Sequence, residues 1–170
     1  LGLIADRTST IGLGTAVLVP NLRHVMTTAS AVATIARLAP GRFTVALGTG
    51  FTARLVMNKR ALSWATTRTY VEQLRALLAG EVVEILGEKC QMIHHPDLAA
   101  ARPIDVPIVL SALGPKGGAI AAEIADGIMH VAPPDGPHEW DCYIEMINGT
   151  VLDPGEDATS ERVVQAAGAW

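Results

Sequence analysis

Apolar runs alternate with segments of helical spacing along most of this chain. Residues 11–19 and 43–47 are almost entirely apolar, which is typical of strands that are covered on both faces. Between these runs, apolar residues recur at helical spacing over residues 25–36, and Pro40-Gly41 ends the segment. The pattern therefore predicts a strand, a helix and a second strand within the first 50 residues.

The middle of the chain changes character. A looser polar segment is expected up to Leu62, and Ser63 then caps a helix that Gly80 ends. The expected buried stripe of this helix is Thr67, Val71, Leu74 and Leu78. Residues 82–86 and 90–93 flank Gly87-Glu88 and predict a β-hairpin. Residues 94–105 are expected to be a connector.

The last third begins with a compact strand–helix–strand unit. A strand over 106–110 precedes a helix with Pro115 at its first position, Gly127 is the expected helix stop, and a strand follows over 128–131. Pro133, Pro134 and Gly136 then indicate a loop. Residues 143–151 fit either a strand or a short helix. An acidic loop over 153–161 leads into a final helix over 161–167.

Alternating strands and helices predict an α/β fold with a parallel sheet. Periodicity alone does not separate a doubly wound sheet from a (β/α) barrel. Three strands end in small residues, after Gly14, Leu47 and Leu110. Barrels build their sites from the loops after several successive strands, so these strand ends favour a barrel.

Composition narrows the function classes. Hydrophobic residues make up 49% of the 170 residues and charged residues 18%, enough for one domain with a large core. The net charge of −4 and the lack of a Lys/Arg run argue against nucleic acid as a partner. No apolar run reaches the roughly 20 residues that span a bilayer, and no signal-peptide pattern occurs. We therefore expect a cytoplasmic protein without a membrane partner, whose Cys90 and Cys142 are unpaired thiols.

Four motifs occur together in a recognisable order. TIGLGTAVLVPNLRH precedes ATIARLAPGRFTVALGTG, TYVEQLRALLAGEVV precedes the hairpin, and VPIVLSALGPKGGAIAAEIADGIM follows. Over residues 10–131 the chain resembles the luciferase-like flavin oxidoreductases, which include bacterial luciferase and the deazaflavin-dependent reductases. The resemblance implies part of a TIM (β/α)8 barrel with one β-hairpin insertion. Residues 1–170 are then expected to be a single domain truncated at both ends, with two barrel strands before Leu1 and one after Trp170.

The resemblance also implies where a cofactor ring would lie. Ala16 and Val17 match the strand that places its backbone against the ring, often through a non-prolyl cis peptide bond. Thr49 and Gly50 match a position that hydrogen-bonds the ring edge or its ribityl tail. GTG alone begins a dinucleotide fingerprint, but no third glycine follows at the required spacing. A Rossmann interpretation is therefore weak.

A third cofactor-binding segment is expected before the helix that starts near Pro115. Ser111, Ala112, Gly114, Pro115 and Lys116 surround a helix N-terminus, where free N–H groups and the helix dipole favour an anion. The segment is no P-loop, because Lys116 is followed by glycine. The resemblance implies that this loop contacts the polar tail or the ring of the cofactor.

Catalytic residues are not assigned by the sequence. Phe51 stands where some deazaflavin dehydrogenases carry an acidic residue, so the proton donor is left open. His130 ends a strand at the expected mouth and is a candidate substrate contact. No metal is expected, because His94 and His95 lack a third ligand at useful spacing. Arg23-His24 is better explained as a structural feature of the barrel rim.

These observations predict an oxidoreductase, either a monooxygenase or a deazaflavin-dependent reductase or dehydrogenase. The cofactor would be FMN or the deazaflavin coenzyme F-420, and the substrate a small organic molecule. Family members often dimerise, which implies a homodimer for the full-length protein. Two alternatives stay open: a catalytically silent flavin-binding barrel, and a TIM-barrel enzyme acting on a sugar phosphate.

Overall fold

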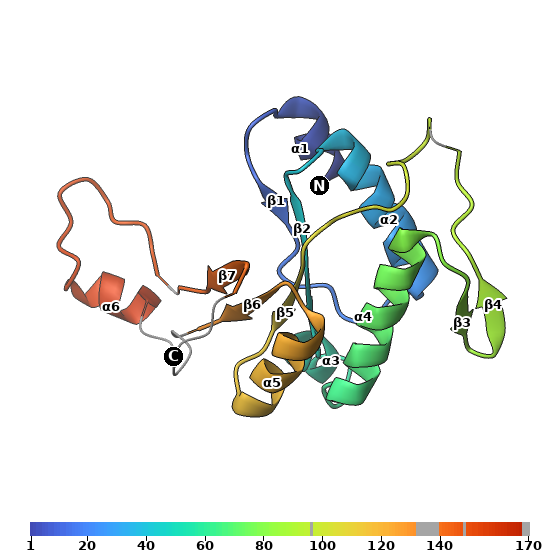
Figure 1. Cartoon of the computed structure of the whole chain (residues 1–170). Helices are drawn as coiled ribbons and strands as arrows, with labels where there is room; N and C mark the ends of the chain where they lie inside the picture. The colour runs from blue at the N-terminus through green and yellow to red at the C-terminus, as the bar shows by residue number, and fades with distance from the viewer. Residues whose placement is uncertain (96, 132–139, 148, 168–170) are drawn as a thin grey trace.

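A curled parallel sheet forms the centre of the molecule (Figure 1). The computed structural model describes residues 1–95, 97–131, 140–147 and 149–167. Its five strands lie in the order β1-β2-β5-β6-β7, and each pairs with its neighbour in parallel. The strands are β1 Leu13–Gly14, β2 Phe43–Gly48, β5 Ile108–Ser111, β6 Gly127–His130 and β7 Cys142–Glu145. The predicted parallel α/β architecture is confirmed.

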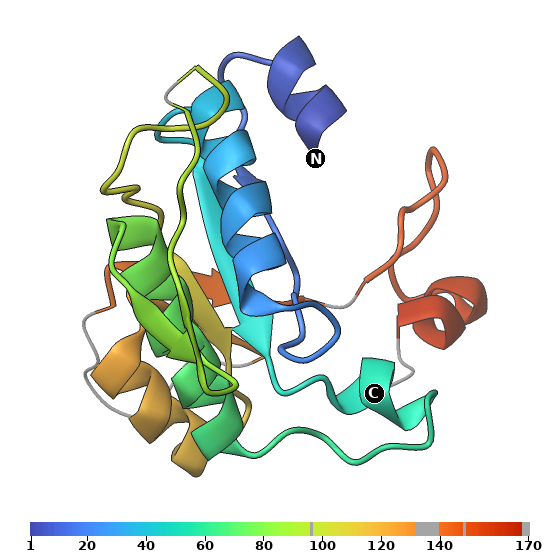
Figure 2. The same cartoon turned by 90° about the vertical axis from the view of Figure 1, so that its right-hand side faces the viewer.

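One face of the sheet is covered by α2 (Val25–Leu38), α4 (Trp64–Ala79) and α5 (Pro115–Ile124), as the two views show (Figures 1 and 2). Val45, Leu47 and Ile108 lie on this face and are at most 1% exposed, as expected for apolar strands packed beneath helices. The α4 helix begins and ends where the sequence predicts. Ser63 accepts a hydrogen bond from the Thr66 amide at its N-terminus, and Gly80 takes a left-handed conformation at its C-terminus.

The other face of the sheet carries a smaller apolar cluster. Ala46, Val109 and Met129 are buried there. The partly buried side chains packed against them are Val17, Cys142, Ile144 and Met146. Because β2, β5, β6 and β7 run parallel in register, their carboxyl ends lie at one edge of the sheet, which we call the carboxyl rim.

Four further elements lie outside this two-layer body. They are α1 (Gly2–Arg7), α3 (Phe51–Leu55), the antiparallel hairpin of β3 (Val83–Ile85) and β4 (Glu88–Cys90), and α6 (Glu161–Ala167). The hairpin is confirmed, but its turn is formed by Leu86 and Gly87, both with positive φ. The second strand therefore starts earlier than the expected 90–93. The segment expected to be loosely polar contains α3.

Two further boundaries differ from the prediction. The strand expected over 11–19 is regular only at Leu13–Gly14 and returns to β2 through a single bridge between Leu18 and Leu47. Gly127 does not end α5, since Ala125 is already extended and Gly127 begins β6. A Cβ atom at Gly127 would overlap the Cys142 carbonyl oxygen and lie 2.7 Å from the Cys142 Cβ. Close strand packing, not helix termination, requires this glycine.

Residues 143–151 fit either a strand or a short helix in the sequence, and the structure forms a strand there, β7. The last helix, α6, has the predicted bounds. The loop expected at Pro133, Pro134 and Gly136 lies outside the described residues. None of the helices in the described part of the chain has the length and apolarity needed to cross a membrane.

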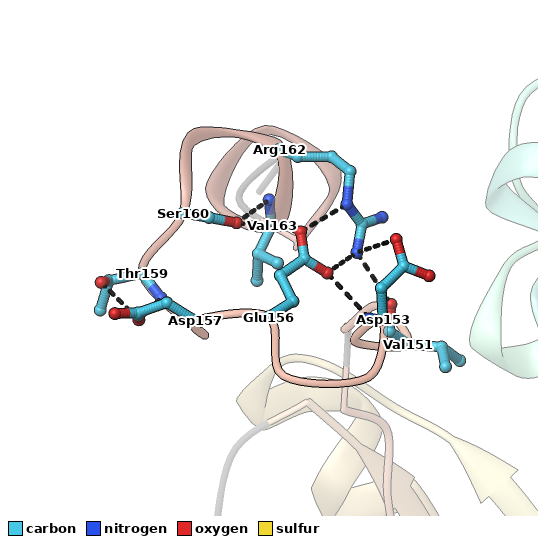
Figure 3. Close-up of polar contacts among 8 residues, drawn as sticks. All are labelled: Val151, Asp153, Glu156, Asp157, Thr159, Ser160, Arg162 and Val163. Carbon is cyan, nitrogen blue, oxygen red and sulfur yellow. Dashed lines mark hydrogen bonds and ion pairs between the residues drawn. The ribbon is translucent and has the colours of Figure 1, made fainter.

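Residues 151–163 fold around the Arg162 guanidinium (Figure 3). Arg162 makes a two-pronged contact with Glu156, one prong of which is the 2.7 Å bond from Nε, and donates to the Val151 carbonyl at 3.1 Å. The Asp153 amide also donates to Glu156, at 2.9 Å. The hydrogen bond from Arg162, followed by that from the Asp153 amide, lowers the pKa of Glu156 to about 2.

Candidate functional site at the carboxyl rim

An interruption in β1 shapes the first part of the site. Gly14 pairs with Thr44 and Leu18 with Leu47, so four residue steps on β1 face three on β2. One extra residue is thus accommodated, as in a β-bulge. The peptide bond between Ala16 and Val17 is cis, at the position that the family resemblance indicates.

The Thr15 side chain replaces the missing main-chain pairing of the bulge. Its hydroxyl donates to the Ala46 carbonyl and accepts from the Ala46 amide, both at 2.9 Å. The Leu18 amide donates to the same carbonyl at 2.9 Å, and the Gly48 amide donates to Leu18 at 3.0 Å. With the backbone of β2 satisfied in this way, Ala16 is left exposed at the rim.

Both glycines after β2 make room for side chains of the β1 segment. A Cβ atom at Gly48 would lie 2.9 Å from Val17 Cγ2. At Gly50, whose φ is +77°, it would overlap Val19 Cγ1. These glycines therefore admit neighbouring valines, which is a different reason for small residues than close approach of a ligand. Thr49 lies between them and is half-buried.

The end of β5 adds the third part of the site. Ser111 pairs with Gly48 on one side and with Met129 on the other. The Ala112 amide donates to the Met129 carbonyl at 3.1 Å, so Ala112 is held against β6 and is buried. The structure thus brings Val17, Gly48 and Ser111 together, because a Cβ atom at Gly48 would contact both neighbours.

The rest of the third predicted cofactor-binding segment faces outward. Gly114 is the N-cap of α5, and no atom lies within 4 Å of where its Cβ would be. Pro115 occupies the first turn as predicted, and Lys116 is exposed with no side-chain partner among the described residues. Gly117 is buried against Trp64 and Ala112. The loop therefore has an inner part, Ser111–Ala112, and an open outer part, Gly114–Lys116.

The histidines divide into structural and rim positions. His24 accepts a hydrogen bond from the Met26 amide at 3.2 Å and caps α2, in agreement with its expected structural role. His94 lies 2.9 Å from the Ala100 carbonyl, and His95 lies beside Asp97. No potential metal-binding cluster occurs among residues 1–95, 97–131, 140–147 and 149–167. His130 is the last residue of β6, at the rim, and half-buried.

Two features of the rim were missed by sequence reasoning. Thr15 interrupts an apolar run, and that polar position is the signal that could have indicated its bridging role. The segment 51–60 was expected to be irregular, yet it contains α3 and returns to the rim through a 2.9 Å bond from the Leu62 amide to the Thr49 carbonyl. Phe51, at its start, is 72% exposed.

The fold and this rim match one family. The model of the luciferase-like monooxygenase family matches residues 1–142, and the chain belongs to that family. It is 31% identical over 162 residues to 5,10-methylenetetrahydromethanopterin reductase of Methanolobus tindarius, covering 92% of this chain and 48% of the relative. It is 35% identical over 138 residues to F420-dependent glucose-6-phosphate dehydrogenase of Nakamurella multipartita, covering 76% of this chain and 40% of the relative.

Solved structures agree with this assignment. The coenzyme F420 dependent tetrahydromethanopterin reductase of Methanopyrus kandleri superposes with a TM-score of 0.60 at 26% identity, over 76% of this chain and 42% of that chain. An F420-dependent secondary alcohol dehydrogenase superposes with a TM-score of 0.62 at 23% identity, over 78% of this chain and 42% of that chain. At this identity the likeness supports the fold alone. The sheet is thus part of a TIM barrel, as predicted, and the chain spans less than half the length of these relatives.

Proposed function

We propose that this chain forms the ring-binding half of an oxidoreductase that uses a deazaflavin or FMN. The observation that carries the proposal is the bulge of β1, which leaves Ala16 exposed beside Val17, Gly48 and Ser111 at the carboxyl rim. Barrel enzymes place their ligands at this end of the strands. Relatives named as F420-dependent support the deazaflavin over FMN.

The residues present fit a flat ring. Open space is found at two rim positions: Ala16 is exposed, and Gly114 has no neighbour within 4 Å of its would-be Cβ. Between them lie Thr49 and Ser111, both half-buried, whose hydroxyl groups make no hydrogen bond among the described residues. In this proposal Ala16 and Val17 lie along the ring, Thr49 and Gly50 hydrogen-bond its edge, and Ser111, Ala112 and Gly114–Lys116 face its polar tail.

When bound, such a cofactor supplies hydride transfer or oxygen activation. The chain's own residues would bind the ring, fix which face it presents and exclude water. Thr15 serves this purpose indirectly by holding the bulge against Ala46. Phe51 offers no carboxylate at the start of α3, so the proton donor is not at that position. The substrate class stays a small organic molecule, with His130 as a proposed contact, and a homodimer stays a prediction.

Fluorescence titration tests the proposal. The full-length protein is titrated with FMN and with the deazaflavin, and each is then assayed for turnover. We expect a dissociation constant in the micromolar range for at least one cofactor, which corresponds to a binding free energy of about −8 kcal/mol. Binding with no turnover over a panel of alcohols, pterins and sugar phosphates would favour the catalytically silent barrel. Dissociation constants above about 1 mM for both cofactors would contradict the proposal.

A further inference from the structure

The first and last parts of this chain carry opposite charge. Residues 7–71 contain eight of the 13 Lys and Arg residues and none of the 17 Asp and Glu residues. Residues 117–161 contain ten of the 17 Asp and Glu residues and no Lys or Arg. Charges of one sign that gather in one region attract a region of the opposite sign. The sequence therefore indicates two surfaces of complementary charge.

The first surface is the loop after β2, residues 51–60, which we call the basic arm. It projects from the end of β2 (Figure 2) and contains Arg54, Lys59 and Arg60 but no carboxylate. Arg54 Nε donates to the Arg60 carbonyl at 2.6 Å, which folds the arm on itself. None of the three cations has an ion pair among the described residues. The positive charge of the arm is therefore available to a partner.

The basic arm also exposes apolar side chains. Phe51 is 72% exposed, Leu55 62% and Val56 81%, and all three lie in α3 or directly after it. Large apolar side chains that gather on a surface and are bordered by polar groups are typical of a protein–protein interface. The arm thus combines exposed apolar area with positive charge.

The second surface is the segment of residues 151–167, which we call the acidic module. It lies beyond the edge strand β7 (Figure 1). The two-pronged contact of Arg162 with Glu156 folds it into one unit (Figure 3). Its charged residues are Asp153, Glu156, Asp157, Glu161 and Arg162. Four carboxylates and one cation leave an excess of three negative charges, which equals the three positive charges of the arm.

The acidic module matches the arm in its apolar content as well. Val151 is 87% exposed, Leu152 43% and Val164 56%. No ion pair joins the module to the arm among the described residues, and Figure 1 shows α3 and α6 well apart. A single copy of the chain therefore leaves both surfaces unpaired.

We propose that the basic arm of one copy of this chain binds the acidic module of a second copy. When both copies make this contact, the result is a two-fold dimer with two equivalent contacts. The opposite charges set the orientation of the two copies, and the exposed apolar side chains supply the area that becomes buried. The proposal concerns assembly and does not depend on the proposed function.

Charge reversal in the full-length protein tests the proposal. The arm variant is Lys59→Glu/Arg60→Glu, and the module variant is Asp153→Lys/Glu161→Lys. The module variant keeps the contact between Arg162 and Glu156 that folds the module. Sedimentation equilibrium at two salt concentrations measures the dimer dissociation constant, and thermal unfolding confirms that each variant folds.

The matched control reverses two exposed cations that lie outside both surfaces. It is Arg7→Glu/Lys89→Glu, with one change in α1 and one in the hairpin. Neither side chain has an ion pair among the described residues. The control thus changes the net charge of the protein as much as the arm variant does, and it should dimerise as the parent protein does.

We expect the parent protein to dimerise, and to do so more weakly at high salt. Either variant alone brings like charges together in both contacts, so its dimer dissociation constant should rise at least about tenfold. In an equimolar mixture of the two variants, the reversed arm meets the reversed module and the unchanged arm meets the unchanged module. The mixture should therefore dimerise about as strongly as the parent protein.

A monomeric parent protein would overturn the proposal. Arm or module variants that dimerise as strongly as the parent protein would place the interface elsewhere, and an equal loss in the control would show an effect of net charge alone. A mixture of two folded variants that stays monomeric would show that the arm and the module do not meet. None of these outcomes involves cofactor binding, so the proposed function is judged separately by its own titration.

Discussion

The two ends of the parallel sheet use their polar side chains in opposite ways. At the amino end, Arg42 and Asp126 are engaged in contacts within the chain. At the carboxyl rim, Lys59, Arg60 and Lys116 lack side-chain partners among the described residues. The difference indicates that the amino end maintains the fold, whereas the rim keeps groups available for a ligand.

Two charged side chains, Arg42 and Asp126, make these contacts at the amino end. Arg42 donates to the carbonyl oxygens of Ile11, Thr8 and Ala5 at 2.8, 2.9 and 3.3 Å, which attaches α1 to the start of β2. Asp126 accepts from the Ile108 amide at 2.7 Å and pairs with Arg75 at 2.8 Å. These charged hydrogen bonds satisfy main-chain groups at the end of α1, just before β1 and at the start of β5.

The largest effect is expected from Gly127→Ala at the amino end. The added methyl group would overlap the Cys142 backbone, so β6 and β7 must separate, at a cost of about 2–3 kcal/mol. Urea denaturation measures this loss. The matched control is Gly118→Ala within α5, where no atom lies within 4 Å of the new methyl group and a gain of about 0.5–1 kcal/mol is expected. Equal stability of the two variants would contradict the described packing of β6 against β7.

The next effect concerns the attachment of α1. Arg42→Gln removes most of the hydrogen bonds to Ala5, Thr8 and Ile11, and we expect a loss of about 1.5–2 kcal/mol. Hydrogen exchange should show faster exchange in α1 with β2 still protected. Arg7→Gln serves as the control, because Arg7 lies on the same helix and its side chain has no hydrogen bond or ion pair among the described residues. An unchanged α1 in Arg42→Gln would show that the amino end does not depend on this residue.

At the carboxyl rim, substitution should affect binding and leave stability unchanged. Ala16→Leu places a large side chain at an exposed position of the bulge, and we expect the affinity for the cofactor ring to fall about tenfold, or about 1.4 kcal/mol. The urea midpoint should stay the same, because no buried contact is lost. Ala158→Leu, also exposed, is the control. If Ala16→Leu lowered the urea midpoint and left the affinity for the cofactor unchanged, the carboxyl rim would serve stability and not binding, which contradicts the prediction.

Sequence patterns predicted the regular elements well because helix caps and apolar spacing are local signals. Ser63, Pro115 and Gly80 mark their helix boundaries as expected. The failures involve contacts between distant segments. Gly127 resembles a helix stop, yet its role depends on β7, and the β1 bulge depends on the pairing of Thr15 with Ala46, which is 31 residues away.

The candidate site shows the same division. The family resemblance located the cis bond at Ala16–Val17, and the register of β2 and β5 brings Gly48 beside Ser111. The reason for Gly48 and Gly50 was not predictable, because it lies in Val17 and Val19 of the segment that follows β1. The ligand contacts of the predicted site residues stay predictions.

The smallest expected effect is the loss of stability on substitution of Arg162, whose contacts are exposed, compared with substitution of the partly buried Arg42. Arg162 binds Glu156 with two prongs, much as Arg42 binds carbonyl groups, but its contacts are exposed (Figure 3). Solvent screens such pairs, so Arg162→Gln should destabilise the protein much less than Arg42→Gln. The pKa of Glu156 is lowered from 4.5 to about 2 by Arg162 and the Asp153 amide.

The sign of the pH dependence follows from that lowered pKa. The stabilisation from Glu156 is fully present above about pH 4.5 and is lost as the pH falls towards about 2. Carboxyl NMR of Glu156 should give a midpoint near 2, moving towards the ordinary value in Arg162→Gln. Asp157→Asn is the control, because it removes a neighbouring carboxylate and leaves the Arg162–Glu156 contact in place. An ordinary midpoint in the parent protein would show that the exposed pair does not persist in solution, and the contrast with Arg42 would become sharper still.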